Sequence, residues 1–200
     1  MALVSIGVEF GQGHSPSAIA VAEVEERKTD RWWENHFKIR YLERLPIGTT
    51  YPAIAERVTR LVQTLRSRHR ATILLYLNAT GIGTPVMDMI RRQPISARVW
   101  DVYFNHGDRR VVVDDREIRL GKAFVVSRLK TLLQAHRIHL PPSPEARILA
   151  EELMEYEVKV SEDANDRYGA FKVGSQDDLV TALGLALQDD GPRRAIIPGR

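Results

Sequence analysis

The segment Leu3-Val-Ser-Ile-Gly-Val-Glu-Phe10 has the alternating pattern of a β-strand. Every second residue is a large apolar one, and the intervening face is small and ends in the carboxylate of Glu9. A polar turn, residues 11–16, separates this segment from a second apolar run, residues 18–22. The sequence therefore predicts a hairpin of two strands with one acidic side chain at the end of the first.

Composition limits the architecture and the kinds of site that the chain can build. Its 200 residues are 44% hydrophobic, which predicts a single domain over residues 1–190. Residues 191–200 are expected to form a flexible C-terminal tail. Cysteine is absent, so disulfides, thiolate metal sites and a cysteine nucleophile are excluded.

Charge and hydropathy indicate where the protein works and what it contacts. No apolar run approaches the length that spans a bilayer, and the N-terminus lacks the pattern of a signal peptide. We therefore expect a cytoplasmic protein with no membrane association. The net charge of +3 permits binding to nucleic acid without requiring it.

The remaining chain alternates between strands and helices. A polar stretch, residues 27–35, leads into a third strand at 36–45, and the three strands are expected to be sequential and antiparallel. An amphipathic helix of about five turns then precedes a nearly continuous apolar strand at 71–77. Further elements are a strand at 97–104, helices at 122–136 and 145–156, and a final helix at about 176–188 that is apolar on nearly every side. This order predicts an α/β fold with a mixed sheet flanked by helices.

Acidic and amide side chains stand at the ends of three of these elements. Glu9 ends the first strand, Asn78 ends the central strand, and Asp177 and Asp178 begin the last helix. If the two strands are neighbours, their ends meet at one edge of the sheet. Oxygen ligands gathered in this way suit Mg²⁺ or Mn²⁺, and two such ions can clamp the attacking water and the leaving oxygen of a phosphodiester.

Three short motifs resemble a known family. Gly7-Val-Glu-Phe-Gly-Gln12 with Ser17-Ala-Ile-Ala20, then Leu77-Asn-Ala-Thr-Gly-Ile-Gly83, then Gln176-Asp-Asp-Leu-Val180 look like the nuclease domain of phage terminase large subunits. The resemblance runs from about residue 3 to 188. It implies a ribonuclease H-like fold, with the first three strands antiparallel and the later ones parallel. It also implies a metal-dependent endonuclease that cuts DNA during viral genome packaging, in the host cytoplasm.

The resemblance assigns the catalytic site to Glu9, Asn78, Asp177 and Asp178, with Glu9, Asp177 and Asp178 as ligands of Mg²⁺ or Mn²⁺. The family usually has Asp at positions 9 and 78. Glu9 keeps the charge on a longer arm, whereas Asn78 offers only one neutral oxygen. Two hypotheses follow: an active endonuclease, or a catalytically degenerate module for DNA binding or packaging assembly. Because no Walker motif is present, a packaging ATPase would be a separate chain or segment, and a portal component is a further expected partner.

Each candidate residue also has a purely structural interpretation. Ser175-Gln-Asp-Asp178 fits a helix capping box, Glu9 a surface carboxylate at a strand end, and Asn78 an ordinary turn residue. Of the two aspartates, Asp178 is favoured as the one that faces the metal, because helical spacing puts it in register with Ala182 and Leu185 on the sheet-facing side of the helix. An actin-like ATPase, suggested by the opening hairpin, would need more than 200 residues for its two lobes.

Overall fold

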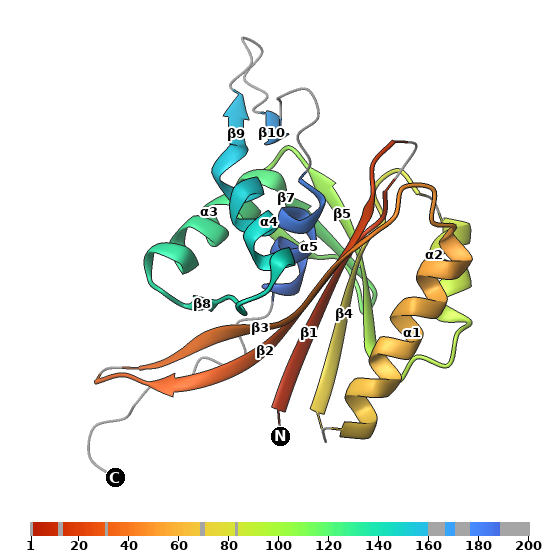
Figure 1. Ribbon diagram of the computed structural model, residues 1–200, viewed down its shortest axis with the longest axis horizontal. Helices are drawn as coiled ribbons and strands as arrows, with labels where there is room; N and C mark the ends of the chain where they lie inside the picture. Colours follow the sequence, from red (N-terminus) through yellow and green to blue (C-terminus); the bar gives the residue numbers. More distant parts are fainter. Residues whose placement is uncertain are drawn as a thin grey trace.

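The computed structural model describes residues 2–11, 14–30, 32–68, 71–82, 84–159, 167–170 and 177–188. A mixed eight-stranded sheet has helices on both faces, with α1 and α2 on one side and α3, α4 and α5 on the other (Figure 1). The strand order is β6-β7-β5-β4-β1-β2-β3-β8. A separate pair, β9 and β10, makes a small two-stranded sheet.

The elements have the following bounds in chain order. The first half contains β1 (Ala2–Glu9), β2 (Ser17–Lys28), β3 (Trp33–Leu45), α1 (Tyr51–Arg68), β4 (Ala71–Asn78), α2 (Thr84–Arg91) and β5 (Arg98–Asn105). The second half contains β6 (Arg110–Val112), β7 (Glu117–Gly121), α3 (Lys122–Gln134), β8 (Ile138–His139), α4 (Pro144–Glu155), β9 (Tyr156–Lys159), β10 (Arg167–Ala170) and α5 (Asp178–Ala186).

The strand directions confirm the predicted fold class. β1, β2 and β3 are sequential and antiparallel, whereas β1 is parallel to β4, β4 to β5, and β5 to β7. The β2–β3 hairpin is longer than the sequence pattern predicted, because most of the polar stretch at 27–35 lies within the two strands. Cross-strand pairs such as Lys38–Glu25, at 2.9 Å, stabilise a polar hairpin arm that has no hydrophobic alternation.

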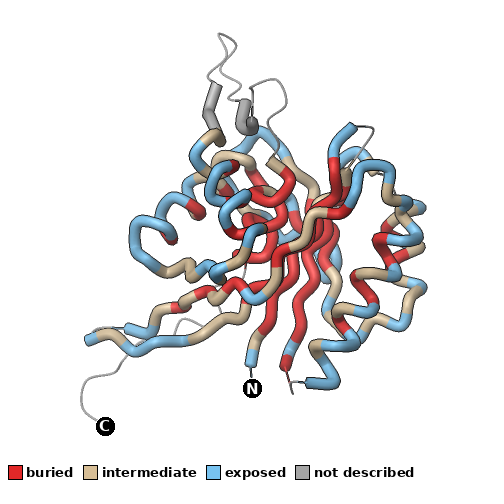
Figure 2. The backbone as a smooth tube through the Cα atoms, in the orientation of Figure 1, coloured by how far each residue is buried: buried red, intermediate tan, exposed pale blue. Residues whose placement is uncertain are grey.

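Two apolar cores lie on the two faces of the sheet, and side chains of β1 pack in both cores. Figure 2 shows the central strands as the most continuously buried part of the chain. α5 packs directly on β1, as expected for a helix that is apolar on nearly every side. A Cβ atom added at Gly7 would lie 2.0 Å from the carbonyl oxygen of Ala182, so this close approach requires glycine. The contact fixes where the start of α5 stands relative to Glu9, two residues further along β1.

Some sequence predictions concern residues outside the described ranges. They include the tail at 191–200, with the domain boundary at 190, and the expected start of the last helix at Gln176 with the capping serine Ser175. In the described part of the chain, no helix is both long and apolar enough to cross a membrane.

Candidate active site

Glu9 and Asn78 meet because β1 and β4 are parallel neighbours that end at the same edge of the sheet. The register pairs Val8 with Leu77, so the next residue of each strand faces the other. The Asn78 amide Nδ2 donates a hydrogen bond to Glu9 Oε2 at 2.7 Å. The Asn78 Oδ1 accepts the backbone N–H of Thr80 at 3.0 Å. Both polar ends of the amide are therefore engaged, one by the carboxyl group and one by the turn after β4.

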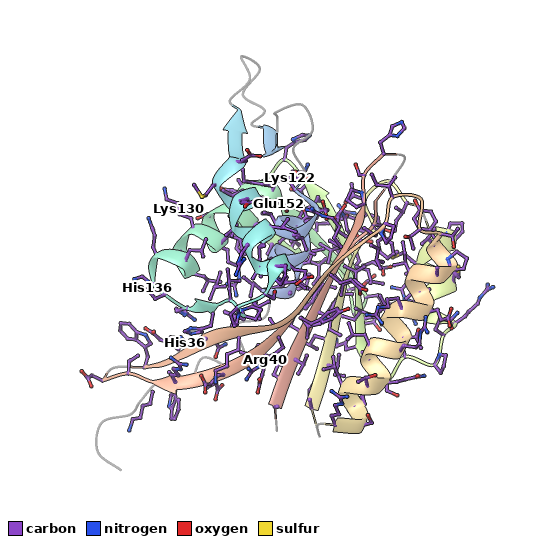
Figure 3. All side chains as sticks on the ribbon, viewed as in Figure 1. His36, Arg40, Lys122, Lys130, His136 and Glu152 are labelled. Carbon is purple, nitrogen blue, oxygen red and sulfur yellow. The ribbon has the colours of Figure 1, made fainter. Side chains whose placement is uncertain are left out.

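A small cavity of about 140 Å³, which we call the Glu9 cavity, opens beside this pair. It joins the ends of β1 and β4 to the residue before α5, Asp177, and to the first residue of α3, Lys122. Figure 3 shows Lys122 near the top of the sheet, on the side covered by α3, α4 and α5. The rest of the lining is mainly apolar or aromatic, and comprises Phe104, Val125, Tyr156, Val180 and Thr181.

The environment of Glu9 favours its protonated form. Removal of the carboxyl group from water is the main cause and raises its pKa from 4.5 to about 8, although part of the residue's surface reaches solvent. The hydrogen bond from Asn78 and the charge of Lys122 lower the pKa, while the charges of Asp177 and Asp178 raise it. The carboxyl group is therefore largely neutral at pH 7, and an added cation would favour its ionisation.

Asp178 lies in a second acidic group that we call the Arg44 cluster, formed by Arg44, Glu152 and Asp178. Asp178 is buried, as its register with Ala182 predicts, but its Oδ2 accepts a hydrogen bond from Arg44 Nε at 2.9 Å. The Arg44 guanidinium also forms an ion pair with Glu152.

Glu152 caps α5 from a different helix. Its Oε2 accepts the backbone N–H groups of Leu179 at 3.1 Å and Val180 at 3.2 Å. These are among the first N–H groups of α5, which have no partner within the helix. The capping box considered from the sequence, residues 175–178, begins outside the described residues. Within them, no side-chain hydrogen bond of Asp177 caps α5. The Arg44 cluster therefore holds the start of α5 in place from β3 and α4.

The structure thus brings together Glu9, Asn78 and Asp177 and places the Asp178 carboxylate with Arg44. Lys122, Arg44 and Glu152 were not predicted from the sequence. The rule that found Glu9 and Asn78 also applies to Lys122, because β7 is parallel to β5 and Lys122 follows its last residue. No such signal marks Arg44 or Glu152. Arg44 is 134 residues from Asp178 in the sequence, and Glu152 is 27 residues from Leu179.

The mixed sheet and its flanking helices match the ribonuclease H-like fold, and the Glu9 cavity lies at the carboxyl ends of β1 and β4. The solved structures that this chain resembles are terminase nuclease domains. The large terminase nuclease of thermophilic phage G20c, solved with bound magnesium, has a TM-score of 0.63 at 18% identity, over 92% of this chain and 80% of that one.

Two further terminase structures, one from human cytomegalovirus and one from a bacteriophage, show the same fold. The human cytomegalovirus terminase nuclease domain, soaked with Mn, has a TM-score of 0.59 at 14% identity over 94% of this chain and 83% of that one. The nuclease domain of the bacteriophage SPP1 large terminase, with bound Mn, has a TM-score of 0.55 at 14% identity over 93% and 85%. The sequence matches no protein-family model and no curated protein. At these identities the similarity establishes the fold.

Proposed function

We propose that this chain is a terminase-type nuclease domain that hydrolyses DNA phosphodiesters with the help of a divalent cation during viral genome packaging. The observation that carries this proposal is the meeting of Glu9, Asn78 and Asp177 in one cavity at the carboxyl ends of β1 and β4. Hard oxygen ligands at such an edge suit Mg²⁺ or Mn²⁺. The similar fold of terminase nucleases solved with magnesium or manganese supports the assignment.

The donor set fits one divalent cation better than two. The carboxylates of the cavity are Glu9 and Asp177, and Asn78 adds only an amide whose oxygen is engaged by Thr80. Over the described residues, no group of three or more His, Cys, Asp or Glu side chains could hold a metal ion. We assign Glu9 and Asp177 as the ligands and give Asp178 a structural role, because its carboxylate is paired with Arg44.

The side chains around the cation have separate tasks in this proposal. A bound divalent cation supplies positive charge against the negative charge that develops on the phosphate. Asn78 Nδ2 holds Glu9 Oε2 in one orientation through their 2.7 Å hydrogen bond. Glu9 must release its proton to act as a ligand, so cation binding is coupled to pH. Phe104, Val125 and Tyr156 line the side of the cavity that β5, α3 and β9 form.

A second function, a DNA-binding or packaging-assembly module without catalysis, is favoured by one observation. The Asn78 amide holds a Glu9 carboxyl group whose pKa of about 8 keeps it mostly neutral at pH 7. A neutral carboxylic acid beside an amide is a poor cation site, because neither group supplies negative charge. Under either function the expected partners are DNA and a packaging ATPase or portal component carried by another chain or segment.

Incubation of supercoiled plasmid with Mn²⁺ or Mg²⁺ at pH 8.5 separates the two functions. The nuclease hypothesis predicts nicking and linearisation by the wild-type protein, lost by a factor of about a hundred or more in Asp177→Asn. Failure of the wild-type protein to cleave, together with retarded migration of bound DNA, would instead support the binding module. Cleavage gained only by Asn78→Asp would identify a nuclease site that this amide has inactivated.

A further inference from the structure

Charged groups of both signs line the Glu9 cavity. Glu9 and Asp177 provide two carboxyl groups, and Lys122 provides an ammonium group whose charge is felt by Glu9. Asn78 is neutral. Within the described lining, the cavity therefore carries at most two negative charges against one positive charge, and this balance limits how many divalent cations it can accept.

A pair of divalent cations needs more negative charge than this cavity supplies. Two ions about 4 Å apart repel one another strongly, and shared carboxylates normally offset that repulsion. Asn78, at the position between Glu9 and the turn, directs its N–H donor toward the carboxyl group and its oxygen toward the N–H of Thr80. An N–H donor cannot ligate a cation. Position 78 therefore offers no charged ligand to a second ion.

Lys122 lines the cavity from the start of α3. It is the first residue of α3 and directly follows Gly121, where an added Cβ atom would lie 1.9 Å from the carbonyl oxygen of Gly107. A cation at a helix N-terminus is unfavourable, because the helix dipole is positive there. Lys122 also forms no ion pair with any residue in the described part of the chain. The charge of Lys122 acts on the Glu9 carboxyl group across the cavity.

We infer that the Glu9 cavity takes one divalent cation, bound by Glu9 and Asp177, and that the Lys122 ammonium group supplies the second positive charge toward the phosphodiester. That the phosphodiester belongs to DNA rests on the proposed function. The number of bound cations rests on the residues of the cavity alone. Lys122 is then a specific contact of the scissile phosphate, which neither the motifs nor the similarity to terminases assigned.

Titration of the metal-free protein with Mn²⁺ at pH 8.5 without DNA, followed by electron paramagnetic resonance of free Mn²⁺, measures the cation count. One Mn²⁺ per chain is expected for the wild-type protein. Lys122→Gln should still bind one ion but about tenfold more tightly, because removal of the ammonium removes a repulsion. Lys130→Gln, an exposed position on the same helix, is the matched control and should bind like wild type. Two ions in the wild-type protein, or unchanged affinity in Lys122→Gln, would overturn the inference.

Plasmid cleavage by the same proteins then separates this inference from the proposed function. Lys122→Gln should lose about a hundredfold in cleavage rate while it gains affinity for Mn²⁺, a combination that a purely structural lysine does not produce. If the wild-type protein binds one Mn²⁺ and Lys122→Gln binds it more tightly but neither cleaves DNA, the cation count stands and the nuclease function is wrong. If cleavage occurs with two ions bound, the nuclease function stands and the inference is wrong.

Discussion

The Arg44 cluster and the Glu9 cavity both lie at the start of α5, but their carboxyl groups have opposite surroundings. In the Arg44 cluster, Asp178 and Glu152 are buried and both contact one guanidinium group. In the Glu9 cavity, by contrast, Glu9 contacts a neutral amide and the cavity has room for a ligand. Buried carboxylates that pair with a guanidinium group are typical of structural support. A carboxyl group with a strongly shifted pKa in a cavity is typical of a functional site. The adjacent residues Asp177 and Asp178 lie one in each of these two groups.

The largest effect is expected from breaking the Arg44 cluster. Arg44→Met leaves Asp178 and Glu152 without their cation in the interior, which typically costs about 3–5 kcal/mol of unfolding free energy. Urea denaturation followed by circular dichroism measures this loss. The control is Arg40→Met, since Arg40 pairs with Glu23 at 2.7 Å on an exposed surface, where a pair contributes about 1 kcal/mol or less. Equal losses in the two variants would contradict the structural role of the cluster.

A smaller effect is expected from the pH dependence of stability that Glu9 causes. Its folded pKa of about 8 exceeds its ordinary value of 4.5, so the folded state holds a proton that the unfolded state releases. This contribution is complete below about pH 4.5 and is lost as the pH rises through 8. In EDTA, the difference in unfolding free energy between pH 5 and pH 9 should be on the order of 2 kcal/mol, reduced by partial exposure of the residue.

Glu9→Gln tests the origin of that pH dependence. The substituted side chain keeps an oxygen that can accept the Asn78 hydrogen bond, but it does not titrate. The variant should therefore lack this component of the pH dependence and be more stable than the wild-type protein at pH 9. An unchanged slope of stability against pH would show that other groups cause it.

Local patterns were sufficient to predict the framework of the molecule. Alternation in residues 3–10 and the apolar run at 71–77 each report a strand directly, and their ends place Glu9 and Asn78 at one edge. The extent of the β2–β3 hairpin was not predictable, because its outer part pairs two polar segments, residues 25–28 and 33–36, that lack hydrophobic alternation. Hydrophobic periodicity thus predicts the buried helices and strands better than it predicts the polar outer part of the β2–β3 hairpin.

The different surroundings of Asp177 and Asp178 could not be predicted from helical register. Helical register favoured Asp178 as the metal-facing aspartate. Its side chain is buried, but its carboxylate pairs with Arg44, which also pairs with Glu152, and both of these residues come from distant segments. The partner of a buried charge is a tertiary property, and an adjacent pair of aspartates gives no sign of it. Lys122 is a different case, because the end of a parallel strand marks its position.

The division of roles between the two aspartates is tested most directly by Mn²⁺ binding to Asp177→Asn and Asp178→Asn at pH 8.5, with both variants shown to be folded. We expect Asp177→Asn to bind Mn²⁺ at least tenfold more weakly than the wild-type protein, because a charged ligand is removed. Asp178→Asn should keep its affinity within about threefold and lose stability instead. Loss of Mn²⁺ binding in Asp178→Asn, with wild-type affinity retained in Asp177→Asn, would contradict the assignment of the Glu9 cavity as the active site.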